Sequence, residues 1–128
     1  MRKIVVLFLS FLLFSCNEIN KKHTFKGVDI NRAEDGSPRH HPNYDSVEKY
    51  ISKIRNFDKI QLKDSTIIKF NIYSDCCQKP KDDVKYSKDT LFIFASFELG
   101  NLCDSYCDYQ FEYHFSKADI KNKKIIIQ

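Results

Sequence analysis

The hydrophobic residues of this chain recur in three different patterns, and each pattern predicts a different kind of element. The first is a continuous run: residues 4–14 are apolar except for Ser10, and they follow the cations Arg2 and Lys3. Such a run is too short for a membrane-spanning helix, which needs about 20 apolar residues, and cations before it are typical of an export signal. We therefore expect residues 1–15 to be a signal peptide.

The second pattern lies between Tyr44 and Phe57, where apolar residues are spaced by three or four positions. This spacing places them on one face of an α-helix. Asp45 and Glu48 have the spacing of a capping box, with Asp in place of Ser or Thr. The sequence therefore predicts a helix over residues 45–56.

The third pattern is alternation, which is typical of β-strands whose two faces differ. Four later segments show it or are apolar on both faces, and turn-like stretches separate them: residues 65–74, 89–98, 109–115 and 123–128. Connections this short favour antiparallel neighbours. The sequence thus predicts a single α+β domain over residues 44–128, in which one N-terminal helix packs on an antiparallel four-stranded meander.

The residues before this domain, 16–43, are polar and show no clear period, so we expect a flexible tether. If residues 17–43 are flexible, their root-mean-square reach is roughly 30 Å. The alternation of Phe25, Val28 and Ile30 leaves room for a short strand within this segment.

The end of the apolar run adds a chemical signal. Leu13, Ser15 and Cys16 stand where the lipobox of bacterial lipoproteins requires such residues, and the sequence resembles that motif. The resemblance implies cleavage before Cys16 and lipid attachment to its sulfur, and several acyl chains together give a stable membrane anchor. Asn17 follows, where many inner-membrane lipoproteins carry Asp, so the resemblance favours the outer membrane.

Charge narrows the possible functions of the exported part. The chain has 21 lysines and arginines against 17 acidic residues. Loss of Arg2 and Lys3 with the signal lowers the formal net charge from +4 to +2, and the remaining cations are dispersed along the sequence. A nearly neutral exported domain is not expected to bind nucleic acid. A domain this small buries limited surface, so covalent cross-links would stabilise it.

Four cysteines remain besides Cys16: Cys76, Cys77, Cys103 and Cys107. An even number in an oxidising compartment favours disulfides. Neighbouring side chains of an extended chain point apart, so a bond between Cys76 and Cys77 is awkward. Two pairings stay open: Cys76 with Cys103 and Cys77 with Cys107, or Cys76 with Cys107 and Cys77 with Cys103.

Metal binding is the alternative role for these cysteines. Four thiolates, or three with His114, would suit Zn(II) or Cu(I), although adjacent cysteines are unusual in structural zinc sites. His40 and His41 are a second metal candidate, in the tether. We expect disulfides and no metal or other cofactor. The nearby aspartates are expected to serve turns and solubility: Asp75, Asp82, Asp83, Asp104 and Asp108.

The segment CDSYCDYQFEYHF, between DTLFIF and KNKKIII, resembles small uncharacterised lipoproteins of Bacteroidota-type bacteria over roughly residues 66–127. The resemblance implies a cysteine-rich turn that leads into an aromatic strand and then a closing strand, and it brings no activity with it.

The sequence contains no G-x-S-x-G, P-loop or H-E-x-x-H motif, so we do not expect an enzyme. The expected function is a binding module of the cell envelope, such as an accessory, immunity or inhibitor protein with a protein partner. Tyr106 and Tyr109 are candidate contacts, because Tyr combines contact area with a polar group; packing beneath the cysteine loop is the alternative role for both. A metal-binding envelope lipoprotein that uses the cysteines is the alternative.

Overall fold

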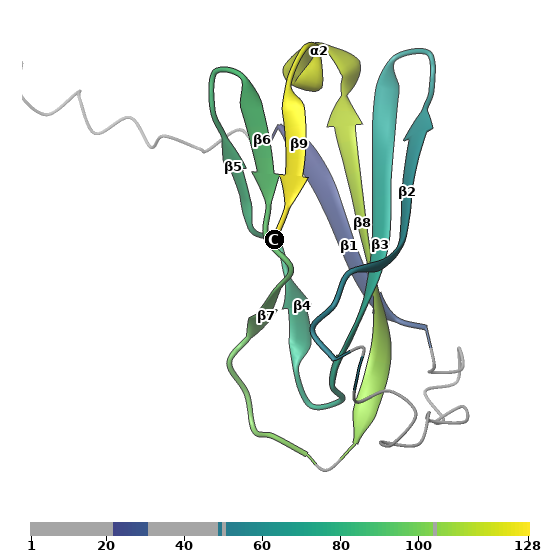
Figure 1. Ribbon diagram of the computed structural model, residues 1–128, viewed down its shortest axis with the longest axis vertical. Coiled ribbons are helices and arrows are strands. Elements are labelled where there is room, and N and C mark those ends of the chain that lie inside the picture. The colour runs from purple at the N-terminus through teal and green to yellow at the C-terminus, as the bar shows by residue number, and fades with distance from the viewer. Residues whose placement is uncertain (1–21, 31–48, 50, 104) are drawn as a thin grey trace, which may run out of the picture.

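The computed structural model describes residues 22–30, 49, 51–103 and 105–128, which form a two-layer β structure (Figure 1). The expected signal peptide, the lipidation residue Cys16 and the histidines His40 and His41 lie outside these residues. In the part of the chain that is described, no helix has the length and apolar character needed to cross a membrane.

The larger layer is a four-stranded sheet in which all neighbouring strands are antiparallel, in the order β1-β8-β3-β2. Its strands are β1 (His23–Asp29), β2 (Arg55–Gln61), β3 (Ser65–Asp75) and β8 (Tyr106–Ser116). β3 and β8 have 11 residues each and pair along their full length. Over residues 65–70 of β3 and 110–115 of β8, buried side chains alternate with less buried ones. The register between the two strands places their apolar residues on the same face of the sheet.

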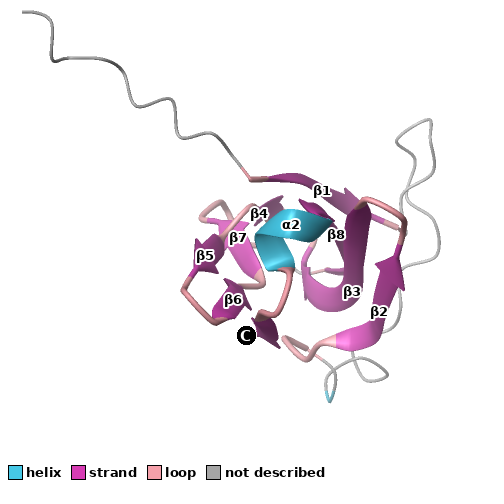
Figure 2. Ribbon diagram, turned by 90° about the horizontal axis from the view of Figure 1, so that it is seen from above, coloured by secondary structure: helices cyan, strands magenta, loops and turns pink. Residues whose placement is uncertain are grey.

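The second layer is a long bent hairpin joined by one more strand. The hairpin contains β4 (Lys79–Lys81), β5 (Val84–Tyr86), β6 (Thr90–Ile93) and β7 (Ser96–Glu98), with β4 paired to β7 and β5 to β6. It bends where the Phe94 amide donates a 2.9 Å hydrogen bond to the Asp83 carbonyl. β9 (Lys124–Ile127) lies parallel to β6. The short helix α2 (Lys117–Ile120) covers one end of the space between the layers (Figure 2).

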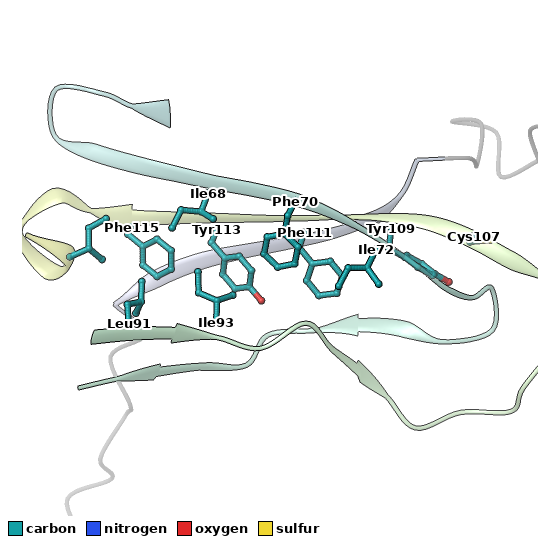
Figure 3. Packing of buried hydrophobic residues seen from close by; sticks show 11 residues of the cluster. Ile68, Phe70, Ile72, Leu91, Ile93, Cys107, Tyr109, Phe111, Tyr113 and Phe115 are labelled. Atoms are coloured by element: carbon teal, nitrogen blue, oxygen red, sulfur yellow. The ribbon is translucent and has the colours of Figure 1, made fainter. Parts of the chain in front are cut away.

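The hydrophobic core fills the space between the two layers (Figure 3). Phe70 and Phe111 of the four-stranded sheet stack with ring centroids 5.1 Å apart. Further along the core, Leu91 and Ile93 of the other layer lie opposite Phe115 and Tyr113 (Figure 3). Full burial of each such side chain stabilises the fold by about 1.5–3 kcal/mol. The aromatic strand β8, which the sequence predicted, therefore forms the centre of the core.

The predicted α+β fold is wrong: the described residues form a mostly β structure and include no N-terminal helix packed on a sheet. Ile51 forms a bridge to Tyr73, and β2 begins at Arg55, inside the expected helix. Residues 45–48 and 50 of that helix lie outside the described part. β2 contains a bulge between Arg55 and Asp58. The extra residue brings Arg55 and Asp58, three positions apart, to the same face of the sheet, so a spacing of three here does not require a helix.

The predicted meander is also wrong. β3 pairs directly with β8, and the expected strand over residues 89–98 breaks into β6 and β7, which lie in the other layer. The stretch before it, expected to be a turn, contains β4. A short connection was taken to mean sheet neighbours, but the hairpin folds across the sheet because its apolar side chains cover the core face of β3 and β8. Strands over 65–74 and 109–115, and the disulfide cross-links, are confirmed.

Candidate functional site

The two disulfides lie together at the end of the domain opposite α2. Cys76 is bonded to Cys107 and Cys77 to Cys103, so the second of the two open pairings is the observed one. Cys107 is fully buried and Cys76 packs against the core, whereas Cys77 is exposed. One bond therefore joins the end of β3 to β8 inside the core, and the other ties the surface loop before β8.

Asp75 organises this loop with its carboxylate. One oxygen accepts a 2.8 Å hydrogen bond from the Cys77 amide, and the other accepts a 2.8 Å bond from the Cys103 amide. Both amides belong to residues of the exposed disulfide, so the carboxylate and the S–S bond hold the same two points of the backbone. The sequence suggested only a turn role for Asp75. Its place directly before two cysteines is the one signal that pointed to more.

The cysteines do not form the metal site considered from the sequence. Donor atoms of Asp75, Cys77 and Cys103 lie within 4.8 Å of one another, which is close enough for a shared ion. The two sulfurs are bonded to each other, however, and the ligand form of cysteine is the thiolate. His114 is bonded to Glu112 and sits seven residues along β8 from Cys107. These residues therefore fit neither Zn(II) nor Cu(I) while the disulfide is intact.

The loop between β7 and β8 exposes two leucines. Leu99 is 100% exposed and Leu102 is 77% exposed, the largest exposed fractions among the large apolar side chains of the described residues. Tyr109 is 3% exposed, and its hydroxyl donates to the Gln78 carbonyl at 2.8 Å, so of its two expected roles it has the packing role beneath the cysteine loop. The apolar surface offered here thus comes from leucines that the sequence analysis overlooked, because exposed and buried leucines look alike in a sequence.

A charged cluster lies on the outer face of the four-stranded sheet near the same end. The Arg55 guanidinium donates to the Asp108 carboxylate and lies 3.7 Å above the ring of Tyr73. The amide of Asn71 reaches the other carboxylate oxygen at 3.5 Å. Burial raises the pKa of Asp108, and the positive charge of Arg55 opposes this shift. The cluster fixes β2 to β3 and β8, and each carboxylate oxygen of Asp108 has a contact within it.

A second buried network joins β1 to the hairpin. The His23 ring bonds Asp82 through Nε2 at 2.7 Å and the Tyr86 hydroxyl through Nδ1 at 3.0 Å. Both ring nitrogens are therefore engaged, Nε2 by a carboxylate and Nδ1 by a phenol. Burial raises the pKa of Tyr86 to about 12, with the charges of Asp119 and Asp82 adding to the shift. A His–Asp pair is the usual core of an acid–base site, but here it works as a clamp between the layers.

Comparison of the chain with protein-family models, with curated proteins and with solved structures found no match. The functional assignment therefore depends on the geometry of the molecule itself.

Proposed function

We propose that this protein is a lipoprotein of the cell envelope, anchored through Cys16, that acts by binding a protein partner and not by catalysis. The outer membrane is its proposed location. The observation that carries the proposal is the loop with Leu99 and Leu102, whose side chains lie in solvent on a backbone tied by a disulfide.

A tied loop of this kind is suited to recognition. Burying an exposed leucine against a partner contributes about 1.5–3 kcal/mol. Ordering a flexible loop during binding would cost part of that gain. The Cys77–Cys103 bond and the Asp75 carboxylate hold this loop before any partner arrives, so more of the gain remains as affinity.

The direction in which the loop points supports the same function. β1 begins at His23 near α2, whereas the loop lies at the opposite end (Figure 1). The seven peptide links between Cys16 and His23 span at most about 25 Å, whatever their arrangement. A lipid on Cys16 would therefore hold the α2 end near the membrane, and the leucines would face away from it.

Site-specific photo-cross-linking in the producing cells tests the proposal. A photoreactive amino acid at Leu102 should give one protein adduct of defined mass. The same amino acid at Val28, a matched apolar position that is 38% exposed on β1, should not give it. Leu99→Asp in the Leu102 reporter chain should abolish the adduct. Equal adducts from both positions, or none from Leu102, would remove the loop as the binding surface.

The metal-binding alternative has a direct test of its own. The chain, purified without reductant and with its disulfides intact, is analysed for bound zinc and copper by elemental mass spectrometry. We expect less than one metal ion per ten chains, since the sulfurs are bonded to each other. One ion per chain in this oxidised protein would make metal handling the better function.

A further inference from the structure

We infer that the α2 end of the domain is a membrane-contacting surface that binds anionic lipid headgroups, and this inference rests on the proposed lipid anchor at Cys16. The α2 end consists of Lys22, the turn 62–65, the turn 87–89 and residues 116–124. The structure brings these segments together at one end of the two layers (Figures 1 and 2).

Hydrogen bonds join the turns of this end. The Lys117 amide donates to the Asp64 carbonyl at 3.0 Å, which connects α2 to the β2–β3 turn. The Lys123 ammonium donates to the carbonyl of Lys88 at 2.7 Å, which connects the start of β9 to the β5–β6 turn. Lys22 shares a hollow of about 400 Å³ with Asp119 of α2 and with Ser65 and Ser116. The segments therefore form one continuous surface.

The α2 end has a strong excess of positive charge. It carries three aspartates against seven lysines, a formal excess of four, equal to the formal net charge of the whole chain. All of these lysines except Lys123 are exposed. The charged residues are Asp64, Asp89, Asp119, Lys22, Lys63, Lys88, Lys117, Lys121, Lys123 and Lys124.

Charges on the outer face of the larger sheet, in contrast, alternate in sign between neighbouring strands. Across the outer face of the larger sheet, the strand register places Lys26 beside Glu112, Glu112 beside Lys69, and Lys69 beside Asp58. The Lys69 ammonium lies 2.9 Å from the Glu112 carboxylate. Alternating signs cancel within a Debye length, about 8 Å at physiological ionic strength, whereas the excess at the α2 end does not cancel.

The position of the anchor decides which polyanion this surface meets. Lys22 stands only six residues after Cys16, so a lipid on Cys16 would bring the α2 end to the bilayer before any other part of the domain. Lysines on long flexible stems reach phosphate oxygens of headgroups readily, and each such contact raises occupancy at an anionic surface by a factor of about five. The lipid anchor and the lysine contacts together hold the α2 end against the membrane, so that the leucine loop lies farthest from it.

Lysine footprinting of the full, processed lipoprotein tests this orientation. The protein is incorporated into vesicles of phosphatidylglycerol and phosphatidylethanolamine, or of phosphatidylcholine alone, and treated with a membrane-impermeant acylating reagent. Mass spectrometry then gives an acylation rate for each lysine. On the anionic vesicles we expect Lys63, Lys117 and Lys121 to react about fivefold more slowly than on the neutral ones. Lys26 and Lys81, which are exposed and lie outside the α2 end as defined, should keep their rates.

Salt and charge reversal provide the matched controls. In 1 M salt the Debye length falls to about 3 Å, so the protection should disappear. The variant Lys63→Glu/Lys121→Glu should lose the protection of Lys117, whereas Lys26→Glu/Lys81→Glu, with the same change in net charge, should keep it. Protection that is equal on both lipids, or that covers Lys26 and Lys81 instead, would overturn the inference.

Failure of the anchor gives a different result. Without lipid on Cys16, the intact mass lacks the acyl chains and the protein leaves neutral vesicles on washing, which would refute the proposed anchor. If the protein stays on both kinds of vesicle and all lysines react alike, the anchor is sound and only the membrane-contacting surface is refuted. Protection that appears only when a second protein is added would assign the α2 end to an acidic partner.

Discussion

The buried hydroxyl of Tyr113 lowers the stability that this residue gives to the core. The side chain is fully buried between the layers, and its hydroxyl has no partner of good geometry among the described residues. Burial raises the pKa of this phenol, and the negative charge of Asp82 adds to the shift, while the nearby backbone of Asp83 opposes it. An unpaired buried hydroxyl costs about 1–3 kcal/mol, so the ring stabilises the core more than the whole residue does.

We expect Tyr113→Phe to raise the free energy of unfolding at pH 7 by about 0.5–1 kcal/mol, less than the full desolvation cost because a small void replaces the oxygen. A raised pKa in the folded state means that stability is intact below pH 10, the ordinary pKa of Tyr, and falls as the pH rises further. Tyr86 contributes in the same direction up to about pH 12. Urea unfolding at pH 7 and pH 10.5 measures both effects.

The variant should lose less stability than the natural chain between these two pH values. Tyr86→Phe serves as the comparison, because its hydroxyl bonds His23 and its removal should destabilise the domain at pH 7. A Tyr113→Phe variant less stable than the natural chain at pH 7 would mean that the hydroxyl has a partner.

Roles of single polar residues were the least predictable from the sequence. Asp75, Asp82 and Asp108 were all assigned to turns, yet each lies in a different network with a different partner: backbone amides, a histidine and an arginine. Nothing local distinguishes these aspartates, because each has a partner 28 to 59 residues away, and that partner depends on which strands meet. The cysteines were predictable as a set, since their number and the expected compartment sufficed.

At the scale of elements, the bulge in β2 explains both the wrong prediction of a helix and the face on which Arg55 lies. Asn56 has a φ of 50°, and the register shifts between Arg55 and Asp58. The extra residue reverses the alternation of the strand, so Arg55 comes to the same face as Asn71 and Asp108. A regular strand would have directed the guanidinium into the core.

A pair of substitutions at Asn56 tests whether this conformation is required. Asn56→Ala should lower the free energy of unfolding by about 1 kcal/mol, because an alanine pays the full cost of a positive φ. Asn56→Gly should leave it within about 0.5 kcal/mol, since glycine adopts this conformation without strain. Thermal unfolding by circular dichroism measures both. Equal effects of the two substitutions would show that the Asn side chain, and not the backbone conformation, is what matters.

Elements were predictable where one pattern dominated and unpredictable where long-range pairing decided. β3 and β8 alternate so clearly that their positions follow from the sequence, and the aromatic content of β8 marks it as a core strand. The bend of the hairpin could not be predicted from the sequence. It lies at Asp83 and Phe94, which are far apart in the sequence and are joined by a backbone hydrogen bond. The parallel pairing of β9 with β6 could not be predicted either. β9 follows β8 after a short connection, and such a connection normally indicates that the two strands are antiparallel neighbours.

At the scale of the whole molecule, the two disulfides have different roles, since one is part of the core and the other holds the leucine loop. They close segments with sequence separations of 31 and 26 residues. In the chain-entropy account each bond stabilises the fold by about 3.5 kcal/mol. Only the bond from Cys77 to Cys103 holds the leucine loop, whereas the bond from Cys76 to Cys107 is part of the core.

Because the Cys76–Cys107 bond still closes nearly the same segment, we expect Cys77→Ser/Cys103→Ser to lower the free energy of unfolding by only about 2 kcal/mol and to leave the sheets folded. Cys76→Ser/Cys107→Ser should cost more, because it also places a hydroxyl at the fully buried position 107. Urea unfolding ranks the two variants, and amide exchange should be faster at position 103 in the first variant than in the natural chain. If the two double variants were equally stable, the buried bond would contribute nothing beyond its loop closure.

Because Cys76 and Cys77 are adjacent, the disulfide pairing of a chain depends on how β3 and β8 were aligned when the bonds formed. A slip of one residue between β3 and β8 would turn every side chain of one strand to the other face. Cys77 would then meet Cys107, and the other pairing would form. The connectivity is thus a covalent record of the alignment in which a given chain first folded, kept after the strands themselves have relaxed. Peptide mapping of the disulfides in a refolded sample would count the chains that took the wrong alignment.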